Sequence, residues 1–166
     1  QNYLDFSSEV KRDLDFLFIG VFEYRKNHKN LVIALSILKQ KGYSFKAECV
    51  GRDQGTWKDT NDLVAKLEME DMIFINNTVL SENELIQKYN QSKIFVSPSL
   101  YEGFGIPLIE AFASGCTVAC SDITVFREVC NDNAFYFDPE SPEDIARGLI
   151  HAIEKDSKAN RSQYLS

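Results

Sequence analysis

The segment KIFVSPSLYEGFGIPLIEAFASG, residues 93–115, contains the alternation that decides the fold. Residues 93–97 predict a buried strand, because they centre on a run of apolar side chains and are followed by Pro98. Residues 107–114 predict a short helix, since proline is favoured in the first turn of a helix and Gly115 lies just past its end. A strand, a glycine-containing loop and a helix therefore follow one another within this segment.

The same alternation extends over the rest of the chain. Short apolar runs predict further strands over residues 15–19, 45–50, 72–75, 116–120 and 134–137. Helical spacing and end signals, including a capping box at Ser81 and Glu84, predict helices over residues 31–38, 61–67, 81–89, 125–129 and 141–153. Repeated strand–helix–strand units form right-handed crossovers and a parallel sheet. The predicted class is therefore α/β: a doubly wound, Rossmann-like, mostly parallel six-stranded sheet with helices on both faces.

Length and patterning favour one domain. The chain has 166 residues, of which 44% are apolar and 26% charged, so a core can form. Residues 1–14 and 155–166 are polar and poorly patterned. We expect a domain over residues 15–154, preceded by a linker and followed by a polar tail.

Charge and cysteine content exclude several classes of protein. The net charge of −7 argues against a general nucleic-acid binder, although it does not forbid a local basic pocket. No uncharged apolar run approaches the ~18 residues that span a bilayer. The four cysteines form no C-x-x-C pair and have no histidine nearby, which argues against both zinc and a disulfide framework. We therefore expect a cytoplasmic protein that binds no metal and no nucleic acid, with its cysteines buried as small apolar side chains.

Two carboxylates within residues 93–115, Glu102 and Glu110, are candidates for ligand binding. Glu110 lies on a helix whose other residues are apolar or small, apart from Ser114, so the helix is expected to be buried all round. Its carboxylate then needs a partner, either the two hydroxyls of a ribose or the side chain of Arg127. Glu102 either contacts a ligand or is a loop charge attracted to the helix N-terminus. Gly105, near that N-terminus, permits unusual dihedrals and close approach of a ligand, as does Gly103.

A cationic cluster follows the first predicted strand. Arg25 and Lys26 stand just before a predicted helix, where cations are unfavourable unless an anion is present. They either neutralise a diphosphate or are solvated surface residues. The chain has only two histidines, His28 and His151, so a hydrolytic triad is not expected.

The quoted residues resemble a known family. The segment EGFGIPLIE, residues 102–110, with its flanks at 95–101 and 111–115 and with residues 18–27, is similar to the C-terminal, donor-binding domain of retaining GT-B glycosyltransferases of the group 1, or GT4-like, family. The likeness runs from about Leu17 to Ile153. It implies one half of a GT-B fold.

The resemblance assigns roles to individual residues. Glu110 would bind the ribose of a nucleotide sugar, and Glu102 would contact the donor sugar together with the amides of three residues, Gly103, Phe104 and Gly105. Gly20, Arg25 and Lys26 would lie at the nucleotide, with the two cations on its diphosphate. The amides from Ile106 to Leu108 would assist there, and the backbone near Thr78 and Val79 would lie beside the base. Catalysis would rest on Glu102, Arg25 and Lys26.

The resemblance also implies a reaction. A sugar would pass from a UDP-, GDP- or ADP-sugar to a glycan or lipid acceptor with retention of configuration, and cations with a helix dipole would stabilise the leaving nucleoside diphosphate without a metal. Residues 1–14 would then be the linker from a missing N-terminal acceptor domain, through which alone the enzyme would touch a membrane. We expect this chain by itself to bind donor weakly and to be inactive. Many relatives have arginine where this chain has Val21, so either Arg25 supplies that charge or the site is weaker.

Other functions stay open. The chain could be a stand-alone, non-catalytic nucleotide-sugar binding module, or a sugar-nucleotide epimerase of the GT-B type. A flavodoxin-like receiver domain needs clustered aspartates after the first strand, where this chain has Val21 and Phe22.

Overall fold

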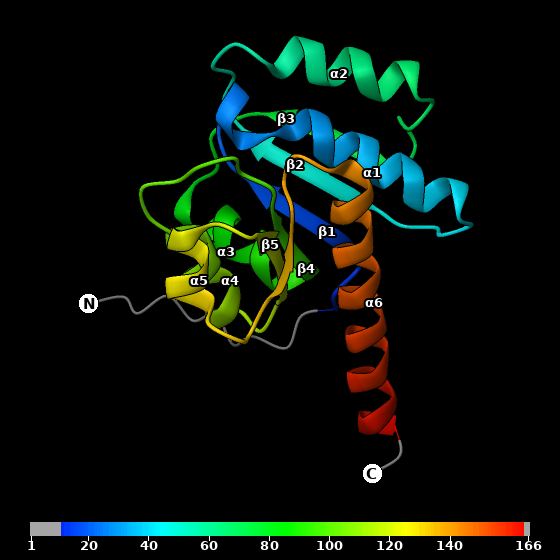
Figure 1. The fold of residues 1–166 in the computed structure, drawn as a ribbon, viewed down its shortest axis with the longest axis vertical. Coiled ribbons are helices and arrows are strands. Elements are labelled where there is room, and N and C mark those ends of the chain that lie inside the picture. Colours follow the sequence, from blue (N-terminus) through cyan, green and yellow to red (C-terminus); the bar gives the residue numbers. More distant parts are fainter. Residues whose placement is uncertain (1–10, 165–166) are drawn as a thin grey trace.

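A single parallel sheet forms the centre of the molecule (Figure 1). The computed structural model describes residues 11–164, and their side chains as far as residue 156. Its strand order is β3-β2-β1-β4-β5-β6, and every neighbouring pair is parallel. The strands are β1 (Leu14–Ile19), β2 (Ala47–Gly51), β3 (Ile73–Asn77), β4 (Ser92–Ser97), β5 (Thr117–Ser121) and β6 (Phe135–Phe137). The predicted six-stranded Rossmann-like sheet is confirmed.

Helices cover both faces of this sheet, as predicted. One core lies beneath α1 (His28–Gln40), α2 (Trp57–Lys66) and α6 (Pro142–Tyr164). The other lies beneath α3 (Glu82–Gln91), α4 (Ile106–Ala113) and α5 (Thr124–Cys130). A short 3-10 helix, η1 (Tyr24–Lys26), connects β1 to α1.

Alternation along β1 supplies both cores. Phe16 and Phe18 belong to the core beneath α1, whereas Leu17 between them belongs to the core beneath α4. Successive side chains of a strand point to opposite faces, so a strand covered on both faces is apolar throughout. This is why residues 15–19 form a nearly continuous apolar run. The strand is central in the sheet, since it pairs with β2 on one side and with β4 on the other.

Two helix boundaries differ most from prediction. α2 begins at Trp57 rather than at residue 61, because the Asp53 carboxylate accepts hydrogen bonds from the Gly55 and Trp57 amides and organises the turn before the helix. α6 continues to Tyr164, through most of the predicted polar tail, and residues 154–164 contain no proline or glycine to end it. The capping box is confirmed, since the Glu84 amide donates to Ser81 Oγ and the Ser81 amide to Glu84 Oε2.

The predicted linker, residues 1–14, is only partly visible. Residues 1–10 lie outside the described residues, and Leu14 already belongs to β1. The Arg12 guanidinium donates to the carbonyl oxygens of Ser92, the first residue of β4, and of Ser114, which follows α4. The chain therefore contacts the domain at Arg12, before the first strand begins.

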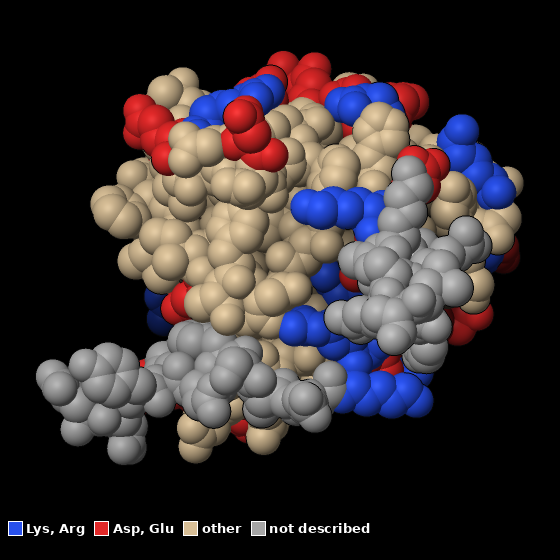
Figure 2. Space-filling model, turned by 90° about the horizontal axis from the view of Figure 1, so that it is seen from below, with Lys and Arg blue, Asp and Glu red and all other residues tan. Residues whose placement is uncertain are grey.

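The cysteines, the helices and the surface charges of the described residues bear on further expectations. All four cysteines are free and buried, which confirms their predicted packing role. Within the described chain no helix is both long enough and apolar enough to cross a bilayer. The face seen in Figure 2 has a wide uncharged area, with acidic and basic side chains next to one another along its upper rim and further basic ones to its right.

Candidate functional site

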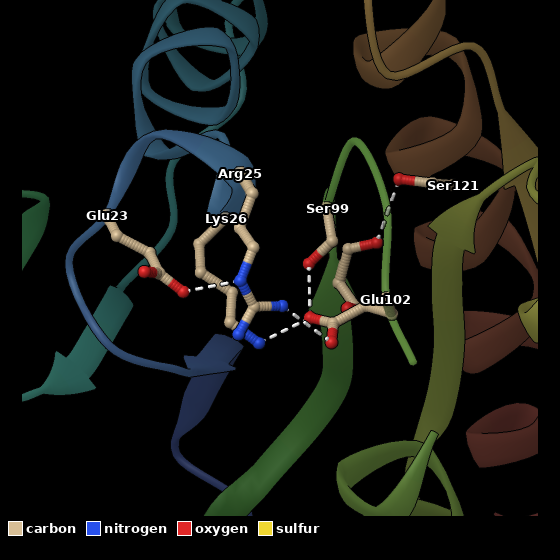
Figure 3. Close-up of polar contacts among 7 residues, drawn as sticks. Glu23, Arg25, Lys26, Ser99, Glu102 and Ser121 are labelled. Carbon is tan, nitrogen blue, oxygen red and sulfur yellow. Dashed lines mark hydrogen bonds and ion pairs between the residues drawn. The ribbon is translucent and has the colours of Figure 1, made fainter. Parts of the chain in front are cut away.

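The loops that follow β1 and β4 meet at the carboxyl edge of the sheet. Parallel strands end at the same edge, and β1 and β4 are neighbours there. η1 follows β1 and supplies Arg25 and Lys26, while the loop after β4 supplies Glu102. Figure 3 shows these side chains pointing toward one another across the gap between the two loops. The Leu100 amide also donates to the Arg25 carbonyl at 2.8 Å, which ties the loops together.

Glu102 lies between two cations. Its Oε2 is 3.0 Å from Arg25 Nη1, and its Oε1 accepts a hydrogen bond from Lys26 Nζ. The side chains of Glu102 and Lys26 are each only 13% exposed, so this pairing is partly screened from water. The structure therefore brings together the three residues predicted to be catalytic. Glu102 is held by side-chain cations, rather than being a loop charge at the helix N-terminus.

Two further residues extend this arrangement. Glu23 Oε1 lies 2.5 Å from Arg25 Nε, and Ser99, which is fully buried, donates its hydroxyl to Glu102 Oε1 at 3.0 Å. Burial by itself would lower the pKa of Arg25, but the hydrogen bonds and charges of Glu102 and Glu23 raise it above its usual value. We call Glu23, Arg25, Lys26, Ser99 and Glu102 the Glu102 cluster (Figure 3).

Sequence reasoning missed Glu23 and Ser99. Glu23 stands two residues before Arg25, and Ser99 three residues before Glu102, so both were within the loops already singled out. The signal available was local: a carboxylate near an arginine and a hydroxyl near a glutamate. A further serine, Ser121, donates to the Ser97 carbonyl at 3.2 Å and joins the ends of β5 and β4 behind the loop.

The two glycines of the loop do not adopt the unusual dihedrals that were expected of them, and only Gly105 is closely packed. Neither Gly103 nor Gly105 has a positive φ, so that part of the expectation is wrong. A Cβ on Gly105 would lie 3.0 Å from Val129 Cγ2, which leaves little room, whereas Gly103 faces open space. Phe104 between them is 69% exposed. The backbone of residues 103–105 is therefore accessible to a ligand on the side of Gly103.

α4 is not buried all round, contrary to expectation. Ile106 and Ile109 are 55% and 50% exposed, because only the stripe containing Leu108 and Ala111 packs on the sheet. Glu110 is accordingly half-buried, not enclosed.

The partner of Glu110 is a residue that the sequence did not indicate. Tyr89, a fully buried residue of α3, donates its hydroxyl to Glu110 Oε2 at 2.8 Å. Burial, and after it the hydrogen bond and charge of Glu110, raise the pKa of Tyr89 well above its usual value. The alternative partner, Arg127, instead pairs with Asp122 at 2.7 and 2.9 Å and lies over the Tyr136 ring. The Arg127 interpretation is therefore wrong.

The N-terminus of α4 offers fewer amides than predicted. Pro107 has no N–H, and the Leu108 amide donates to the Gly105 carbonyl at 3.1 Å. Of these three described residues, Ile106 alone keeps an amide without a partner. An anion at this helix end would therefore meet Ile106 rather than Leu108.

A cavity of about 390 Å³ lies at the ends of β1, β2 and β3. It brings together Gly20, Thr78 and Val79, which were predicted to lie near a nucleotide, and Val21 lines it as well. A Cβ on Gly51, another lining residue, would stand only 2.0 Å from the Gly20 carbonyl oxygen, so glycine is required there for the two loops to approach. Most of the exposed lining is apolar, which suits a flat ring.

Among the described residues, no group of three or more histidine, cysteine, aspartate or glutamate side chains is placed to hold a metal ion. Positive charge at the site comes from Arg25 and Lys26.

Comparison with known proteins identifies relatives of the whole domain. The O-antigen chain mannosyltransferase B of Escherichia coli is 32% identical over 143 residues, which are 85% of this chain and 37% of that protein. The chain thus spans about a third of this relative's length. Among solved structures, the C-terminal domain of the group 1 glycosyl transferase LpcC from Francisella tularensis superposes with a TM-score of 0.79 at 22% identity, covering 91% of this chain and 86% of that one.

A second solved structure carries ligands. Anabaena Alr3699/HepE, in complex with UDP and glucose, superposes with a TM-score of 0.76 at 19% identity over 89% of this chain and 40% of that chain. These superpositions establish the fold as a Rossmann-like half of a GT-B fold. Residues 2–164 match the family described as glycosyl transferases group 1, and the chain belongs to that family.

Proposed function

We propose that this chain is the donor-binding domain of a retaining mannosyltransferase that takes mannose from a nucleoside diphosphate sugar and adds it to a polysaccharide. The observation that carries the proposal is the Glu102 cluster, because two cations from η1 converge on Glu102, in the loop that leads to the free amide of Ile106. Mannose as the sugar rests on the relative named as a mannosyltransferase. The four buried free cysteines favour the cytoplasm as its location.

The parts of the site suit the parts of such a donor. The base would lie in the cavity formed by Gly20, Thr78 and Val79, and the diphosphate against Arg25, Lys26 and the Ile106 amide. The donor sugar would face Glu102 and the backbone of the loop at residues 103–105. Glu110, which has one oxygen engaged by Tyr89, would use the other for a ribose hydroxyl.

The chemistry follows from these charges. Transfer with retention passes through a transition state in which the sugar gains positive charge and the departing diphosphate gains negative charge. Arg25 and Lys26 stabilise the departing diphosphate, and Glu102 lies where positive charge develops on the sugar. A nucleophile, or a group that positions the reacting end of the acceptor, is supplied by another domain, so the isolated chain is expected to bind donor without turnover.

Isothermal titration calorimetry with UDP, GDP and ADP tests this proposal. At least one nucleotide should bind saturably, and Arg25→Ala should weaken it about 10–100-fold, the usual worth of a charge-assisted hydrogen bond. Arg127→Ala is the matched control, since Arg127 is also ion-paired but to Asp122, away from the cluster. If none of the three binds, or if both variants weaken binding equally, the proposed site is wrong.

A further inference from the structure

A second, larger cavity lies beside η1. It measures about 630 Å³ and is bounded by the first turns of α1 and α2, by Leu100 and by Glu140. It shares no lining residue with the cavity at the ends of β1, β2 and β3. None of the donor contacts proposed above occupies it.

The wall of this cavity contains buried polar atoms that lack partners. His28 is 2% exposed, and its ring stacks on Phe22 at 4.3 Å between ring centroids. Neither ring nitrogen of His28 has a hydrogen-bond partner in the described structure, and the same holds for the buried hydroxyl of Thr56. More than nine in ten buried polar groups in native proteins are paired. Two unpaired side chains in the wall of one cavity therefore indicate that something polar belongs there.

His28 must be satisfied by a neutral group. Burial, with a smaller contribution from the charge of Lys26, lowers the pKa of His28 to about 3. The imidazole is therefore uncharged at neutral pH and offers one N–H donor and one acceptor nitrogen. Thr56 likewise offers a hydroxyl that both donates and accepts. A hydroxyl group complements both, because it too donates and accepts.

The rim of the cavity narrows the ligand class. Three carboxylates, Glu23, Asp59 and Glu140, line the cavity together with a single ammonium, Lys29, so the lining does not attract an anion. An apolar ligand would leave the polar wall unpaired. Tyr24, which is 79% exposed, presents a ring beside these groups. Sugar rings combine hydroxyl groups at their edges with an apolar face, and this face can stack on an aromatic ring such as that of Tyr24.

We propose that this cavity binds an uncharged sugar unit of the acceptor glycan, a role that rests on the proposed function. The cavity adjoins the donor site through Glu23, which lines it and whose carboxylate also holds Arg25 of the Glu102 cluster. Leu100 forms a second link, because it lines the cavity and its amide donates to the Arg25 carbonyl at 2.8 Å. A glycan seated here would lie next to the residues that bind the donor.

Titration of the isotope-labelled chain, followed by ¹H–¹⁵N NMR, tests this proposal with methyl α-mannoside and an α-linked mannobiose as probes. Saturable shifts are expected at the amides of residues 28–30 and 56–60. Tyr24→Ala and Asn30→Ala should each weaken binding about 2–10-fold, as expected for loss of an aromatic or polar contact. Phe74→Ala is the control, since Phe74 is an aromatic residue 53% exposed on β3 and outside the cavity lining, and it should leave binding unchanged.

The same samples separate this inference from the proposed function. Absence of saturable shifts at these amides, or equal affinity of Tyr24→Ala and the wild type, would overturn the cavity as a sugar site even if a nucleotide binds. Saccharide binding at these amides, in samples where UDP, GDP and ADP all fail to bind, would support the cavity while overturning the proposed function. Binding of both, with Tyr24→Ala weakening only the saccharide, would support both.

Discussion

The two sides of the site hold their carboxylates in different ways. On the η1 side Glu102 is enclosed by two cations and a buried serine hydroxyl, and its side chain is 13% exposed. On the α4 side Glu110 has one neutral partner, the hydroxyl of Tyr89. Two cations thus balance the charge of Glu102 before any ligand arrives. Glu110 has a neutral partner instead, and its second oxygen is left for a ligand. A phosphate entering the first side must share cations with Glu102, but a ribose entering the second side meets a ready acceptor.

The largest expected effect is the loss of stability at low pH that comes from His28, on the η1 side. His28, the first residue of α1, is buried with its pKa lowered to about 3, whereas in the unfolded chain its pKa is near 6.5. The unfolded chain therefore binds a proton that the folded chain does not, so stability falls as the pH drops from about 6.5 toward 3. Between pH 6.5 and 4 we expect this residue to remove about 2–3 kcal/mol.

Chemical denaturation of the wild type and of His28→Leu at several pH values measures this loss. Carboxylates also titrate in this range, so the informative quantity is the difference between the two proteins. The loss of stability between pH 6.5 and 4 should be smaller in His28→Leu by that amount. Parallel pH profiles would show that the imidazole is not held neutral by burial.

A smaller effect is expected on the α4 side. Tyr89→Phe removes the hydroxyl that donates to Glu110 and should lower the free energy of unfolding by about 1–2 kcal/mol, the cost of a lost hydrogen bond to a half-buried charged group. Tyr24→Phe is the matched control because Tyr24 is 79% exposed. Urea unfolding at pH 7 compares the two variants. Equal stability of both would mean that the Tyr89 hydroxyl does not support Glu110.

The sequence predicted the sheet well because its signals are local. Residues 93–97 and 107–114 differ in period and are separated by a proline and two glycines, so strand and helix could be told apart from neighbouring residues alone. That the loops carrying the Glu102 cluster lie close together could also be predicted, because parallel strands bring the ends of β1 and β4 to one edge.

The partners and exposure of side chains could not be predicted in the same way. Tyr89 and Glu110 are 21 residues apart and lie on different helices, and no local pattern connects them. The exposure of Ile106 and Ile109 was missed because apolar composition does not say how much of a helix its own sheet covers. Arg127 was a reasonable partner for Glu110 by charge, but Asp122, five residues earlier, is closer to it in both sequence and space.

The affinity of one nucleoside diphosphate for Glu102→Gln and for Glu110→Gln tests the central claim most directly. With the nucleotide that binds the wild type best, calorimetry should show tighter binding to Glu102→Gln, by about 3–10-fold, since Arg25 and Lys26 lose their internal counter-ion. Binding to Glu110→Gln should weaken by a similar factor, because a charged acceptor of a ribose hydroxyl is replaced by a neutral amide. Changes of the same sign in the two variants would contradict the claim that one carboxylate guards the phosphate site while the other receives the ribose.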